Sequence, residues 1–60
     1  MLNDISLYIQ AGKEARRARK QHDEARANHW KKWFTTAKYM EKPEDRIAAE
    51  KAFNDGYEEG

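Results

Sequence analysis

The sequence has no cysteine and no valine, a single proline and only three glycines among its 60 residues. Without cysteine the chain can form no disulfide, and it lacks the thiolate ligands that structural zinc sites commonly use. No stretch approaches the ~18 apolar residues of a membrane span, and the first residues lack the basic-then-apolar order of a signal peptide. We therefore expect a cytoplasmic protein that is not associated with a membrane.

Residues suited to catalysis are equally scarce. Ser6 is the only serine, and no histidine is near it in the sequence. The three glycines are too far apart to form a phosphate-binding loop. His22 and His29 share a helical face, but they do not supply the full ligand set of a structural zinc site. We predict no enzymatic activity, no metal site and no cofactor.

Apolar and small residues recur at helical spacing in two stripes, and strand signals are missing. The first stripe, which Asn3 or Asp4 can cap, comprises Ile5, Tyr8, Ile9, Gly12 and Ala15. The second stripe comprises Trp30, Trp33, Phe34, Ala37 and Met40. Pro43 predicts the start of a further helix that ends near Asp55, with Gly56 as its left-handed C-cap. The sequence thus predicts one all-α domain over residues 1–60.

Two architectures fit these helices. In the first, a single long helix runs over residues 4–41, and the helix after Pro43 folds back on it as a hairpin, with Phe53 against the aromatic residues of the long helix. In the second, the chain turns near residues 21–24 and forms a monomeric three-helix bundle. The two stripes are in phase at ~100° per residue, and no glycine or proline lies between Gly12 and Pro43. We therefore favour the long helix.

Gly12 also bears on the oligomeric state. Glycine inside a helix costs about 1 kcal/mol relative to alanine, and a close helix crossing would explain its presence. In the long-helix architecture this small-residue patch has no partner within the chain, and a chain this short has a thin core. We predict a homodimer with antiparallel first helices, in which basic residues of one chain lie near acidic residues of the other. The candidate interface residues are Ile5, Tyr8, Ile9, Gly12 and Ala15.

Charge is strongly segregated along the chain, although the net charge is only +1. Residues 13–38 carry nine basic and three acidic side chains, a net +6, whereas residues 41–60 carry three basic and seven acidic ones, a net −4. We expect the basic helix to steer a protein partner and exposed aromatic residues to add affinity. The candidate partner-binding residues are Arg16, Arg17, Arg19, Lys20, Trp30, Lys31 and Tyr39.

A protein partner is the leading hypothesis, and two alternatives stay open. The cations around residues 13–20 are also suited to phosphates, so a nucleic-acid-binding accessory protein is the runner-up. Glu14 within this run and the acidic residues that follow it count against that alternative. A purely structural assembly element is the third possibility.

The chain also resembles a known group of proteins in its size and composition. It combines a charged, alanine-rich first half, the pair His29-Trp30 and the terminal run Ala52-Phe53-Asn54-Asp55-Gly56-Tyr57. In this it is similar to the small early proteins of lambda-like phages that are encoded between the exonuclease and excisionase genes. The resemblance implies an early regulatory protein, located in the cytoplasm of the bacterial host, that binds a host or phage protein and shifts the balance between lytic and lysogenic development. It assigns no functional residue.

Overall fold

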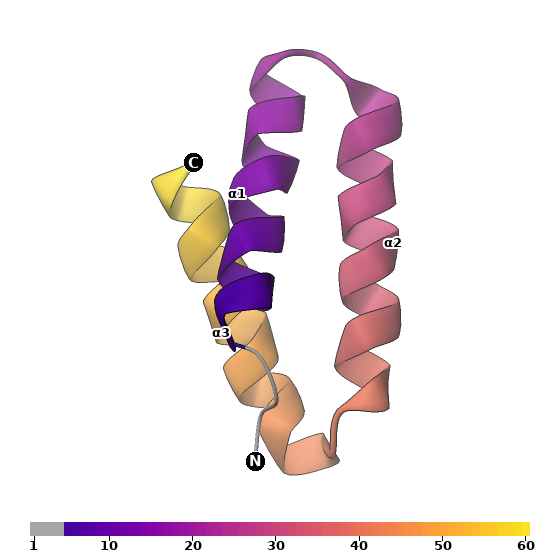
Figure 1. Ribbon diagram of the computed structural model, residues 1–60, viewed down its shortest axis with the longest axis vertical. Helices are drawn as coiled ribbons and strands as arrows, with labels where there is room; N and C mark the ends of the chain where they lie inside the picture. Colours follow the sequence, from indigo (N-terminus) through magenta and orange to yellow (C-terminus); the bar gives the residue numbers. More distant parts are fainter. Residues whose placement is uncertain (1–4) are drawn as a thin grey trace.

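The computed structural model describes residues 5–60, which form three helices and no strand. Helix α1 comprises Ile5–Lys20, α2 comprises Glu24–Met40 and α3 comprises Pro43–Glu59. Helix α2 runs antiparallel to the other two, and α1 lies between α2 and α3 in the view of Figure 1. The all-α class predicted from the sequence is confirmed. The cap expected at Asn3 or Asp4 lies outside the described residues.

The structure differs from the favoured single helix over residues 4–41, because the chain turns at residues 21–23. The backbone N–H of His22 donates to the carbonyl of Arg19 at 3.0 Å, and that of Asp23 donates to the carbonyl of Ala18 at 2.8 Å. This pair of bonds closes a helix whose next residue is left-handed, and His22 has a φ of 58°. Asp23 then caps α2, since its carboxylate accepts a hydrogen bond from the backbone N–H of Arg26 at 3.1 Å.

The left-handed residue explains why the turn near residues 21–24 was predicted only as the alternative to a single long helix. Glycine usually occupies this position because it has no Cβ to clash with the backbone. Histidine can adopt the conformation at a cost of roughly 1–2 kcal/mol, and here the cap of Asp23 and the packing of α2 on α1 outweigh that cost. The sequence between the two stripes therefore contains no helix-breaking glycine or proline, although the chain turns there.

Helix α3 begins as predicted and ends later than predicted. Pro43 occupies its first turn together with Glu44 and Asp45, where the exposed backbone N–H groups favour negative charge. The helix does not end near Asp55 but continues to Glu59, so Gly56 is not its C-cap. No glycine among the described residues has a positive φ. Gly56 must therefore serve a purpose other than chain reversal.

That purpose is the crossing of α1 and α3. A Cβ atom added to Gly56 would overlap the backbone carbonyl of Ile9, and one added to Gly12 would overlap the carbonyl of Phe53 and lie 2.7 Å from the backbone nitrogen of Tyr57. The close crossing predicted from Gly12 is present, but its partner is α3 of the same chain. The two small-residue faces, which were expected to pack elsewhere, pack against each other.

This crossing buries residues that were predicted to form the dimer interface. Tyr8, Gly12 and Ala15 are buried within the single chain, and Ile9 is half-buried, whereas Ile5 is 49% exposed. Three of the five candidate residues are therefore occupied by contacts with α2 and α3. A homodimer stays a prediction, and in this arrangement it would have to form through other surfaces.

Alanine dominates the core, and aromatic side chains close it. Six of the eight buried apolar residues fall into two clusters, which are Tyr8, Ala49 and Ala52, and Ala11, Ala15 and Phe53. Trp33 and Phe34 of α2 pack against both clusters, and the rings of Phe34 and Phe53 stack with centroids 4.2 Å apart. The expected contact of α3 with the aromatic residues of α2 is confirmed. Even so, α3 packs more extensively against α1 than against α2.

Tyr8 of α1 contacts the short link between α2 and α3. The hydroxyl of Tyr8, a residue only 3% exposed, donates to Glu41 Oε1 at 3.4 Å in the short link between the two helices. Away from this link α2 and α3 diverge on either side of α1, as Figure 1 shows. A groove lies where the two helices diverge.

Candidate functional site

Most of the basic run in α1 is already engaged within the chain. Lys13 Nζ lies 3.7 Å from a carboxylate oxygen of Glu59, and Lys20 Nζ donates to the carbonyl of Gly60. Arg16 lies over the ring of Tyr57, with its Cζ 5.0 Å from the ring centroid. The acidic end of α3 thus lies along the basic run of the same chain. The sequence predicted such a pairing between the two chains of a dimer.

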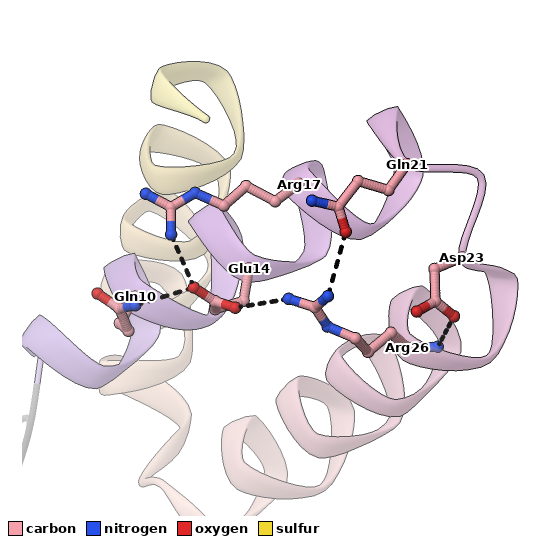
Figure 2. Close-up of polar contacts among 6 residues, drawn as sticks. All are labelled: Gln10, Glu14, Arg17, Gln21, Asp23 and Arg26. Atoms are coloured by element: carbon pink, nitrogen blue, oxygen red, sulfur yellow. Dashed lines mark hydrogen bonds and ion pairs between the residues drawn. The ribbon is translucent and has the colours of Figure 1, made fainter.

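Arg17 belongs to a polar network that joins α1 to α2 (Figure 2). At its centre is Glu14, whose carboxylate accepts hydrogen bonds from Gln10 at 3.2 Å, Arg17 at 3.0 Å and Arg26 at 3.1 Å. Arg26, on α2, also donates to the side chain of Gln21 at 3.2 Å. The Glu14 side chain is only 19% exposed, so its negative charge is largely enclosed by these donors. This role of Glu14 was not predicted, because Arg26 lies across a turn that the favoured single helix does not contain.

A hollow of about 330 Å³ opens where α2 and α3 diverge. All three helices contribute to it, and α1 lies at its base. The residues around it are Ala15 and Arg19 of α1, Ala27, Asn28 and Lys31 of α2, and Phe53, Asn54 and Tyr57 of α3. Its buried members are apolar, its rim carries two cations and two amides, and none of these residues is acidic. The combination is typical of a surface that binds an apolar group flanked by negative charge.

A second hollow of about 460 Å³ continues the first toward the α1–α2 turn. It shares Arg19, Ala27 and Asn28 with the first, so the two form one groove along the side of α2. Its remaining residues are His22 and Asp23 of the turn and Glu24, the first residue of α2. We refer to the two hollows together as the α2–α3 groove.

The groove brings together two of the predicted partner-binding residues. Arg19 of α1 and Lys31 of α2 are both exposed, and neither side chain has a hydrogen-bond or ion-pair partner among residues 5–60. Arg16, Arg17 and Lys20, in contrast, have contacts within the chain. Arg19 and Lys31 are thus the cations that remain available to a partner at this surface.

Trp30 and Tyr39, the predicted aromatic contacts, have different positions. The Trp30 ring is half-buried and packs edge-on against Trp33, with centroids 6.0 Å apart, as part of the cluster around Phe53. Tyr39 is 61% exposed near the other end of α2, with Lys38 Nζ 5.3 Å and Arg46 Cζ 5.1 Å from its ring centroid. Trp30 therefore packs against Ala15 and Phe53, which line the groove, and neither Trp30 nor Tyr39 lines it.

Two kinds of feature, a side-chain cluster suited to a metal ion and a membrane-spanning helix, are absent from the described residues. Within residues 5–60, no three histidine or acidic side chains gather in a way that could hold a metal ion, and no helix has the length and apolarity needed to cross a membrane. Comparison of the chain with protein-family models, with curated proteins and with solved structures finds no match.

Proposed function

We propose that this protein is a small regulatory accessory protein that acts by binding a partner protein in the α2–α3 groove. The observation that carries the proposal is the position of Arg19 and Lys31, two unpaired cations of different helices, beside the buried apolar residues Phe53 and Ala27. A protein partner can match both features at once, because it can place an apolar side chain beside carboxylates. The resemblance to early phage proteins supplies the setting, in which the partner is a host or phage protein and its capture shifts the lytic–lysogenic balance.

Nucleic-acid binding is the less favoured alternative. A duplex is held by many phosphate contacts, and its binding weakens steeply with salt when six or more of them form. Lys13 and Arg17 are paired with carboxylates here, and the acidic residues of α3 border the same face of α1. Two free cations beside an apolar hollow suit an acidic protein segment better than a phosphate backbone.

Site-specific photocrosslinking in bacterial cells tests the proposal. A photoreactive residue at Asn28, on the rim of the groove, should give a discrete crosslink to another protein. The same residue at Thr36, which is exposed on α2 and outside the groove, is the matched control and should give none. The Asn28 crosslink should disappear when Arg19→Glu and Lys31→Glu are combined. A crosslink pattern that is the same at both positions would contradict binding in the groove.

A salt titration decides the nucleic-acid alternative. We expect no measurable binding of the chain to an arbitrary duplex at low salt, because few phosphates can be matched by unpaired cations. Binding with a steep dependence on salt would favour the alternative.

A further inference from the structure

From the shape and charge of the α2–α3 groove we infer that its occupant is an amphipathic helix with an acidic flank, supplied by the partner protein. This inference rests on the proposed function and names the kind of segment that the groove binds. The alternatives to such a helix are an extended peptide, a second copy of this chain and a nucleic acid, and each predicts a different experimental result.

The length and walls of the groove suit a helix. On α2 its lining extends from Glu24 to Lys31, which at a rise of ~1.5 Å per residue is about 10 Å, or about two helical turns. In the hollow of about 330 Å³, residues of α2 and α3 form the walls and α1 forms the base, so a fourth helix placed there would pack against three others. Burial of one apolar stripe between neighbouring helices is the usual way in which helices associate.

The base of the groove has space for apolar side chains. Ala15 and Ala27 are 2% and 7% exposed and extend no further than a methyl group, while the Phe53 ring forms one wall. The volume of about 330 Å³ at this end falls within the ~300–1,000 Å³ range of sites that bind small ligands. A leucine or methionine from the occupant would fill the space that the two alanines leave.

The rim determines the charge of the occupant. Arg19 and Lys31 stand beside this hollow, and none of its eight lining residues is acidic. At the turn, Asp23 already accepts the hydrogen bond that caps α2, and Glu24 adds a further negative charge. The acidic flank of the occupant therefore belongs near Lys31 rather than at the turn.

A designed peptide provides a direct probe. The peptide is a helical 18-mer of roughly five turns, with leucine on one face, glutamate beside the leucines and alanine elsewhere. Isothermal titration calorimetry with the full chain should show saturable binding of one peptide per chain. Two control peptides, one with lysine in place of glutamate and one with alanine in place of leucine, should bind at least about tenfold more weakly, a difference of about 1.4 kcal/mol.

Variants of the chain show whether the peptide occupies the groove. Combining Arg19→Glu with Lys31→Glu should weaken binding of the acidic peptide by about tenfold or more. Lys51→Glu is the matched control, because Lys51 is exposed on α3 and does not line the groove. It should leave the affinity unchanged, and circular dichroism should show equal helicity for all variants.

Several results would overturn the inference. These are equal binding of the acidic and lysine peptides, an affinity that the double variant does not change, and a dimer in sedimentation equilibrium that dissociates when Arg19→Glu and Lys31→Glu are combined. A crosslink at Asn28 without any binding of the acidic helix would refute the helical occupant and leave the proposed function standing. Binding of the acidic helix without a crosslink in cells would refute the proposed function alone.

Discussion

Gly12 of α1 and Gly56 of α3 bring two helices into backbone contact, since each glycine lies against main-chain atoms of the opposite helix. The neighbours of Gly12 are the Phe53 carbonyl and the Tyr57 nitrogen, and those of Gly56 are the main-chain atoms of Ile9. Backbone atoms cannot move aside as the end of a flexible side chain can. The fold therefore depends on the absence of a side chain at both positions.

Gly12→Ala should destabilise the protein although alanine is the better helix former. Alanine would gain about 1 kcal/mol in helix propensity, but its methyl group would overlap the Phe53 carbonyl. We expect a net fall of roughly 2 kcal/mol in the free energy of unfolding, measured by urea denaturation followed by circular dichroism. Thr36→Ala, at an exposed position on α2, should be neutral or slightly stabilising. An equally stable Gly12→Ala protein would show that the crossing is looser than the structure has it.

His22→Gly should stabilise the protein by about 1 kcal/mol, because glycine adopts the left-handed conformation without the penalty that histidine carries. The same substitution inside a continuous helix would lower stability by about that amount. Thermal denaturation of His22→Gly therefore distinguishes the turn from an uninterrupted helix by the sign of the change. Ala25→Gly, at an exposed position within α2, serves as the control and should be destabilising.

Glu14→Gln should loosen the link between α1 and α2. The carboxylate accepts from Arg17 through one oxygen and from Arg26 through the other, and the neutral amide would keep the shape of the side chain but lose the negative charge and one of the two acceptors. Because the site is partly exposed, we expect a loss of about 1 kcal/mol rather than the larger cost of a buried pair. Chemical denaturation measures the change, and Glu50→Gln, on the exposed face of α3, should have no effect beyond about 0.5 kcal/mol.

Stability should fall at alkaline pH because of Tyr8. Burial of its hydroxyl, together with the negative charge of Glu41 and the hydrogen bond to it, raises the pKa of Tyr8 above its usual value of 10.0. The folded state thus binds the proton more tightly than the unfolded state does, so this contribution is complete below pH 10.0 and is lost as the pH rises through the higher, folded value. The slope of unfolding free energy against pH between pH 10.0 and the folded value should become shallower in Tyr8→Phe. Tyr39→Phe, which alters an exposed ring, should retain the slope.

The helical class and the start of α3 could be predicted from the sequence, but the sequence could not decide how the helices are arranged. Pro43 could be placed because proline fixes its own φ and suits only the first turn of a helix. The turn near residues 21–24 could be given only as an alternative, since its left-handed residue is a histidine in place of the usual glycine, and only the neighbouring hydrogen bonds identify it. Gly12 indicated a close crossing but not the identity of the opposing helix.

The groove was only partly predictable for the same reason. Arg19 and Lys31 were both candidates on grounds of charge, but their convergence depends on the turn between them. Asn54 and Tyr57 were not predicted as walls, because the contact of α3 with α1 depends on the parallel course of two helices far apart in sequence. The signal in the sequence for the contact of α1 with α3 was the spacing of small residues in each of the two helices.

The parallel pairing of α1 with α3 also has a kinetic consequence. The contacts of α2 with α1 close a short connection, whereas those between Gly12 and Gly56 join the two ends of the described chain. Closing a longer loop costs more entropy, so contacts distant in sequence tend to form after local ones. The pair α1–α2 should therefore assemble first and α3 should dock last. Only that last event completes the proposed binding surface, because Phe53 and Tyr57 arrive with it.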